Sequence, residues 1–88
     1  MILHLGGDVI IPLSDVIAIV DFESVETSKD TKEFLKIAAE EGFVRKITDD
    51  PPKSFILAEI DKKSVVYFSP ISSVTLLKRS GFIEDIGL

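Results

Sequence analysis

Residues 55–68 read FILAEIDKKSVVYF, two short apolar runs separated by a charged triplet. Each run is rich in β-branched, aromatic or aliphatic side chains, and the intervening Asp61-Lys62-Lys63 suits a tight turn. We therefore predict an antiparallel hairpin with strands over Phe55–Ile60 and Val65–Phe68. Strands that come in hairpins favour an antiparallel sheet over the crossover connections of a parallel one.

The N-terminal quarter of the chain repeats this kind of pattern. Ile2–Leu5 and Val9–Ile11 are predicted strands, joined by a Gly6-Gly7-Asp8 turn in which glycine reaches positive φ without steric cost. Val16–Phe22 is a third predicted strand, and it is apolar on both faces. We expect that strand at a central position in the sheet, covered on both sides.

The polar stretch after the third strand carries helix-start signals. Ser28 or Asp30 can cap a helix that runs to about Glu41 and stops at Gly42, a residue suited to the left-handed end of a helix. Phe43–Ile47 is a short segment that can extend after it. The expected apolar stripe of the helix comprises Phe34, Leu35, Ile37 and Ala38.

A second helix is predicted after the hairpin. Ser69-Pro70 is expected to open it, with Ser69 as the cap and proline at the first helical position. Lys78 and Arg79 fall in its last turn, where cations suit the helix dipole, and Gly81 ends it.

Together these segments predict an α+β fold in the order ββ(β)-α-ββ-α. We expect a small antiparallel sheet of about five strands with two helices packed on it. A length of 88 residues fits a single domain over 1–88, with a loose C-terminal tail over 84–88.

The composition indicates whether copies of the protein associate and in which compartment the protein works. Apolar residues make up 45% of the chain, a large share for a core this small, so we expect a homo-oligomer whose copies cover one another's apolar faces. The absence of cysteine, of a secretory signal pattern and of a long apolar run favours the cytoplasm, with no membrane partner.

The charge is acidic but uneven. A net charge of −5 argues against broad attraction to nucleic acid, and residues 1–30 hold six carboxylates against one lysine. Residues 51–88 are slightly basic by comparison. Lys53, Lys78 and Arg79 are therefore the candidate residues for binding a nucleic acid, if copies of the chain repeat them along one surface.

No group of residues points to catalysis, to a metal or to a cofactor. His4 is the only histidine, and the Asp49-Asp50 pair has no further ligands beside it. Gly6-Gly7 precedes a strand, whereas a phosphate loop precedes a helix. The candidate nucleophiles lack a neighbouring base in sequence: Ser69, Ser72 and Ser73. We expect no enzyme activity.

An ordered set of short motifs resembles a known family, the bacterial extracellular-matrix regulators, and within it the RemB-like more than the RemA-like subgroup. The matching motifs span nearly the whole chain. They are Ile2-His4-Leu5-Gly6, Ile19-Val20-Asp21-Phe22, Glu33-Phe34-Leu35, Pro52-Lys53-Ser54, Tyr67-Ser69-Pro70 and Ser72-Ser73-Thr75-Leu76-Lys78-Arg79.

The resemblance implies a small regulator of biofilm-matrix gene expression. RemA-like members look like ring-shaped homo-oligomers that bind DNA through projecting arginines. Where those relatives have arginines, this chain has Asp15, Asp50 and Pro51, while Lys53 matches a basic position of the family. Carboxylates in place of phosphate-facing arginines repel DNA.

Three interpretations of function stay open at this point. The first is a DNA-associated oligomeric regulator that uses Lys53, Lys78 and Arg79. The second is an acidic protein–protein assembly module of the same fold that does not touch DNA. The third is an enzyme or small-ligand sensor with a pocket between subunits, which no residue pattern supports.

Overall fold

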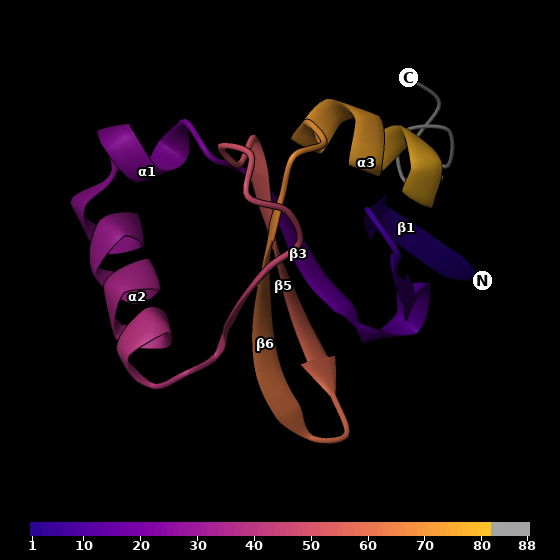
Figure 1. Ribbon diagram of the computed structural model, residues 1–88, viewed down its shortest axis with the longest axis horizontal. Helices are drawn as coiled ribbons and strands as arrows, with labels where there is room; N and C mark the ends of the chain where they lie inside the picture. Colours follow the sequence, from indigo (N-terminus) through magenta and orange to yellow (C-terminus); the bar gives the residue numbers. More distant parts are fainter. Residues whose placement is uncertain (82–88) are drawn as a thin grey trace.

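The structure is a computed structural model that describes residues 1–81, and Figure 1 traces its path. The expected α+β class is confirmed. The elements follow one another as β1 (Ile2–Gly6), β2 (Val9–Pro12), a 3-10 turn η1 (Leu13–Asp15), β3 (Val16–Asp21), α1 (Ser24–Thr27), α2 (Lys29–Glu40), β4 (Val44–Lys46), β5 (Ser54–Ile60), β6 (Lys63–Ser69) and α3 (Ser73–Ser80).

The β5–β6 hairpin forms the centre of a four-stranded sheet with the strand order β3-β5-β6-β4. Its strands pair in register along their whole length, with Ser54 opposite Ser69. Asp61 and Lys62 connect them with φ angles of 51° and 66°, a conformation that matches the twist of the flanking strands. The predicted hairpin is confirmed, and both strands extend slightly beyond their expected ends.

The outer strands of this sheet refine the prediction. β3 pairs with β5 alone and is an edge strand, so the expected central position is wrong. Its two apolar faces are nevertheless both used, because Ile19 packs against one core cluster and Val20 against the other. β4, at the opposite edge, runs parallel to β6, so the sheet is mixed where a fully antiparallel one was expected.

The β1–β2 hairpin and α3 cover one face of the sheet (Figure 1). This hairpin is a separate two-stranded sheet, in which Leu3 lies opposite Ile11. Both side chains point inward and pack with Leu5, Ile56 and Leu76, each of them at most 3% exposed. The side of the sheet that faces the hairpin therefore holds a closed apolar core.

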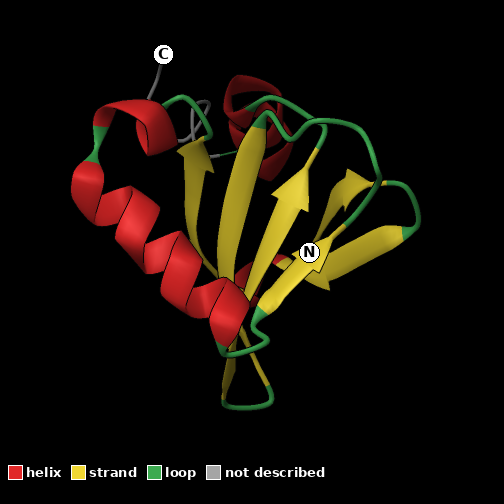
Figure 2. Cartoon of the chain, turned by 60° about the vertical axis from the view of Figure 1, so that its left-hand side comes forward, coloured by secondary structure: helices red, strands yellow, loops and turns green. Residues whose placement is uncertain are grey.

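The helix α2 covers the opposite face of the sheet (Figure 2). Leu35 and Ala38 turn toward the sheet and pack with Phe55. Phe22, just after β3, meets Phe55 and Phe68 edge to face at ring-centroid distances of 6.2 and 5.1 Å, the favoured geometry for aromatic pairs. Only half of the predicted apolar stripe of α2 is buried.

The ends of α2 form as predicted. Ser28 caps the helix, because its hydroxyl accepts a hydrogen bond from the backbone N–H of Thr31 at 3.2 Å. Gly42 follows the helix with a φ of 79° and so supplies the left-handed residue that ends it. Asp30, the alternative cap, lies inside the first turn. The short helix α1 that precedes Ser28 was not predicted.

The start of α3 differs from the prediction. Its cap is Ser72, whose hydroxyl accepts from Thr75 N–H at 3.2 Å, and the helix ends at Gly81 as expected. Ser69 instead closes β6, and its buried hydroxyl donates to the carbonyl of Leu5 at 2.6 Å and accepts from Ile71 N–H at 3.0 Å. The serine that looked like a helix cap thus attaches the N-terminal hairpin to the sheet.

None of the helices in residues 1–81 is long and apolar enough to cross a membrane. The tail predicted over 84–88 lies outside the described residues.

Candidate interaction surfaces

Lys53 stands at one end of the central sheet, directly before β5. Its backbone is fixed from two sides, since Lys53 N–H donates to the Ser69 carbonyl at 2.8 Å and Phe22 N–H donates to the Lys53 carbonyl at 3.0 Å. Its side chain is exposed and makes no ion pair within the described part of the chain. The structure therefore holds the backbone of Lys53 in place and leaves its ammonium group exposed at this end of the molecule.

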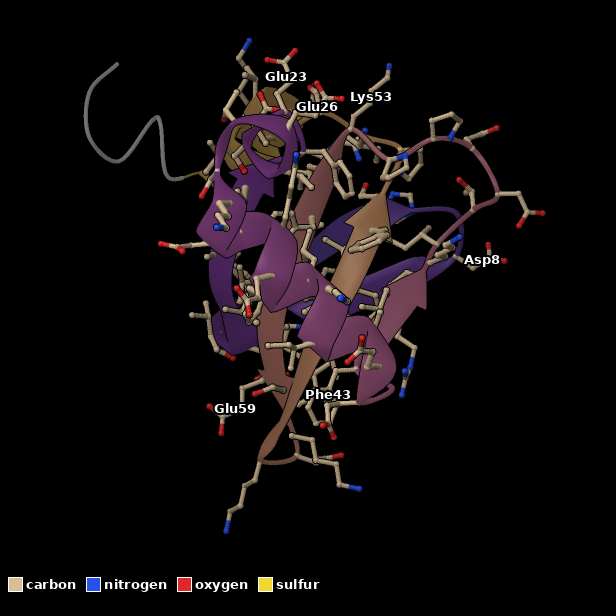
Figure 3. All side chains as sticks on the ribbon, turned by 90° about the vertical axis from the view of Figure 1, so that its left-hand side faces the viewer. Asp8, Glu23, Glu26, Phe43, Lys53 and Glu59 are labelled. Carbon is tan, nitrogen blue, oxygen red and sulfur yellow. The ribbon has the colours of Figure 1, made fainter. Side chains whose placement is uncertain are left out.

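The surroundings of Lys53 are acidic. Figure 3 shows Glu23 and Glu26 at the same end of the molecule as Lys53. A surface hollow of about 450 Å³ is lined by Lys53 together with Asp21, Glu23 and Glu26. Three carboxylates and one ammonium leave this hollow with a negative balance, which weakens attraction to phosphate. We call it the acidic hollow.

Lys78 and Arg79 lie at the far end of α3 from Lys53. Both are exposed in the last turn of the helix, whereas Ser72 and Ser73 at its first turn line the acidic hollow beside Lys53. Six residues of helix span about 9 Å. The Arg79 guanidinium donates a long hydrogen bond of 3.4 Å to the backbone carbonyl of His4. The three predicted cations thus flank α3 and do not form one cluster.

The carboxylates that replace the relatives' arginines lie on loops. Asp15 ends the 3-10 turn before β3 and is partly buried. Asp50 is exposed in the loop before β5, where its N–H donates to the Thr48 hydroxyl at 3.3 Å. Asp50 and Pro51 share a small surface hollow with Lys46. Asp50 is therefore positioned to add negative potential on the approach to Lys53.

The residues considered for catalysis have structural contacts. The Nε2 atom of the exposed His4 lies 2.8 Å from the carbonyl of Gly7, within its own hairpin. Across residues 1–81, no three histidine, cysteine or carboxylate side chains gather as a metal site would require. Ser69 and Ser72 hold backbone groups, as described above.

Two exposed apolar surfaces were not singled out from the sequence. The first, here called the hairpin face, is the outer side of the β1–β2 hairpin, with Ile2 65% and Ile10 54% exposed. The second, here called the helix hollow, is a cavity of about 280 Å³ between α2 and the central sheet, rimmed by Ile17, Phe34, Ile37 and Phe43. The signal in the sequence that could have indicated these surfaces is that both segments hold more apolar residues than their buried positions require.

Comparison with known proteins places the chain. The RemA-like family, described as extracellular matrix regulatory protein A-like, matches residues 2–79. Extracellular matrix regulatory protein B of Bacillus subtilis (strain 168) is 34% identical over 86 residues, which cover 98% of each chain. The resemblance seen in the ordered motifs is confirmed, and the chain belongs to the RemA-like family of extracellular matrix regulatory proteins.

Proposed function

We propose that this protein is a non-catalytic, cytoplasmic regulator of extracellular-matrix gene expression that works as an assembly of identical copies. Its family and its relative in Bacillus subtilis carry the name of matrix regulators, which supports the regulatory role. The observation that supports assembly is the pair of exposed apolar surfaces, the hairpin face and the helix hollow.

Contiguous apolar surface of this kind usually marks an interaction site. The hairpin face carries Ile2 and Ile10, and the rim of the helix hollow carries two half-exposed aromatic rings, Phe34 and Phe43. Burying these side chains against a second protein surface is favourable by roughly 25 cal/mol for each Å² of apolar area removed from water. The second protein surface can belong to another copy of this chain, because copies are present together wherever the protein is made.

Assembly is tested by sedimentation equilibrium or light scattering of the purified full chain. The expected result at about 10 µM is a mass that is a multiple of the 9.7 kDa chain, because apolar interfaces of copies associate in this range. A single species of 9.7 kDa at that concentration contradicts the assembly.

A second candidate is DNA binding by the assembly through Lys53, Lys78 and Arg79. The observation that favours it is that all three side chains are exposed and make no ion pair within residues 1–81, so each can approach a phosphate. The acidic hollow and Asp50 oppose it. Of the two candidates, the charges favour assembly through protein contacts over binding to DNA.

The two candidates are separated by a gel shift with AT-rich promoter DNA across about 50–200 mM salt. If the cations contact phosphates, Lys53→Gln weakens binding on every DNA sequence and lowers the salt slope by about one. Lys62→Gln is the matched control, because Lys62 is an exposed lysine in the β5–β6 turn at the opposite end of the sheet. No shift at low salt excludes DNA and leaves the assembly standing.

A further inference from the structure

The two outer strands of the central sheet differ in how their free edges are protected. An edge strand exposes unpaired backbone groups, and proteins usually protect it by short length, by lysine or by proline. β4 follows this rule, because it is three residues long and exposes Arg45 and Lys46. β3 is six residues long, and from Val16 to Val20 it contains neither a charged residue nor a proline. Its edge is therefore the less protected of the two.

The outer backbone groups of β3 are available for pairing. Figure 2 shows β3 as the outermost strand of the central sheet, on the side away from β4. Beyond β5, β3 has one backbone partner within residues 1–81, the Leu13 carbonyl that accepts from Val16 N–H. The register shift is confined to the stretch between Val16 and Ala18. The rest of the strand, to Asp21, therefore offers a regular edge to one more strand.

Carboxylates stand at both ends of this edge. Asp15 directly precedes β3, Asp21 closes it, and Glu23 and Glu26 follow, while the first lysine or arginine of the chain is Lys29. None of these four carboxylates forms an ion pair within the described part of the chain. Six residues of strand separate Asp15 from Asp21, which corresponds to about 20 Å.

We infer that the edge of β3 binds an extended segment of a different protein, apolar in its middle and carrying a lysine or arginine at each end. Backbone hydrogen bonds of an added strand supply affinity in this mode of recognition, and side chains supply specificity. The apolar contact is Ile17, which is 57% exposed on β3. The terminal cations of the segment would meet Asp15 and Asp21, so its basic residues are expected about six positions apart.

A second copy of this chain fits the edge less well. Two β3 strands paired antiparallel would bring Asp15 of one copy toward Asp21 of the other, and like charges across strands are destabilising. The basic strand β4 is half as long as β3. The guanidinium of its Arg45 already donates to the Gly42 carbonyl at 2.8 Å. The inference therefore goes beyond the proposed assembly, with which it shares only Ile17 on the rim of the helix hollow.

The test measures binding of three labelled synthetic peptides to the full chain by fluorescence anisotropy. The probe is Lys-Val-Thr-Val-Thr-Val-Lys, and its charge control has glutamate at both ends. We expect the lysine peptide to bind at least about tenfold more tightly, and less tightly as salt rises from about 50 to 300 mM. A third peptide with proline in place of the central valine is expected not to bind, because proline interrupts the hydrogen bonds between strands.

Variants of the chain locate the binding. Ile17→Lys places a lysine on the edge and is expected to weaken the lysine peptide at least about tenfold. Ala39→Lys is the matched control, since it adds the same charge at an exposed position of α2 and should leave binding unchanged. Asp15→Asn and Asp21→Asn should each weaken binding about two- to fivefold, the range of an exposed ion pair. Asp8→Asn, in the exposed β1–β2 turn, should have no effect.

Hydrogen exchange of the wild type gives a measurement that needs no variant. The lysine peptide should slow the exchange of β3 amides and leave β4 amides unchanged. Equal binding of all three peptides, or of none, overturns the inference. So does an Ile17→Lys chain that no longer assembles when the wild type binds no peptide, because a second copy then covers the edge.

The two proposals fail in different ways. A monomeric chain that binds the lysine peptide at β3 supports the inference and contradicts the assembly. An assembled chain that binds none of the peptides overturns the inference and leaves the assembly intact. Circular dichroism and urea unfolding check that each variant folds, and the exposure of Ile17 predicts a small effect on stability.

Discussion

The two faces of the central sheet are covered to different degrees. On the side of the β1–β2 hairpin and α3, Leu5, Ile56 and Leu76 are fully buried, and a serine hydroxyl ties the hairpin to the sheet. On the side of α2, Leu35 and Ala38 stay 6% and 5% exposed, and the layer opens into the helix hollow.

This difference separates two uses of apolar side chains in a small protein. On the hairpin side, the leucines are buried and stabilise the monomer. The α2 side buries half of its apolar stripe and leaves the other half, Phe34 and Ile37, exposed. In a chain of 88 residues the core is small, and in the proposed assembly other copies would cover this exposed half.

The largest effect that tests this comparison is expected from truncating one leucine on each side of the sheet. Leu76→Ala is expected to lower the free energy of unfolding by about 3–5 kcal/mol, because the cavity it leaves is enclosed on all sides. Leu35→Ala is expected to cost about 2–3 kcal/mol, since its layer is open at the hollow and can relax. Urea unfolding of both variants measures the difference, and an equal or reversed order contradicts the comparison.

A smaller effect is expected at the serine that attaches the hairpin. Ser69→Ala leaves the Leu5 carbonyl and the Ile71 N–H without the hydroxyl that joins them, at a cost of about 1–3 kcal/mol. Ser64→Ala on the same strand is the control, because Ser64 is exposed and its loss should stay within about 0.5 kcal/mol. Hydrogen exchange should show faster opening of β1 in the Ser69 variant alone.

The smallest effect compares the two helix caps. Ser28→Ala and Ser72→Ala each remove a hydroxyl that accepts a backbone N–H at 3.2 Å, at a cost of about 1 kcal/mol. Ser72 should cost a few tenths more, because its hydroxyl also donates to the Thr75 hydroxyl at 3.0 Å. Thermal unfolding of the two variants measures both losses of stability. A larger loss for Ser28→Ala than for Ser72→Ala would contradict the expected order.

Features that depend on neighbours in sequence were predictable. The β5–β6 hairpin, the Ser28 cap and the stops at Gly42 and Gly81 each follow from the local preferences of a few residues. Lys53, Lys78 and Arg79, the candidate residues for binding a nucleic acid, are exposed in the structure. Local chemistry determines these features whatever the rest of the chain does.

Features that depend on distant segments were not predictable. Ser69 had the local pattern of a helix cap, but its partner is Leu5, 64 residues earlier in the chain. The edge position of β3 follows from which strands pair, and its apolar pattern indicates only that both faces are covered. The carboxylates around Lys53 come from the segment after β3, so no pattern near Lys53 shows its acidic surroundings.

The bond between Ser69 and the Leu5 carbonyl also bears on the order of events during synthesis. The β1–β2 hairpin is synthesised before the other described elements, yet two isolated strands are only marginally stable in water. Its inner leucines pack against β5 and α3, which follow in the second half of the described chain, α3 as its last element. The apolar side of the hairpin therefore stays uncovered until α3 has been made, and during that interval a chaperone can bind it.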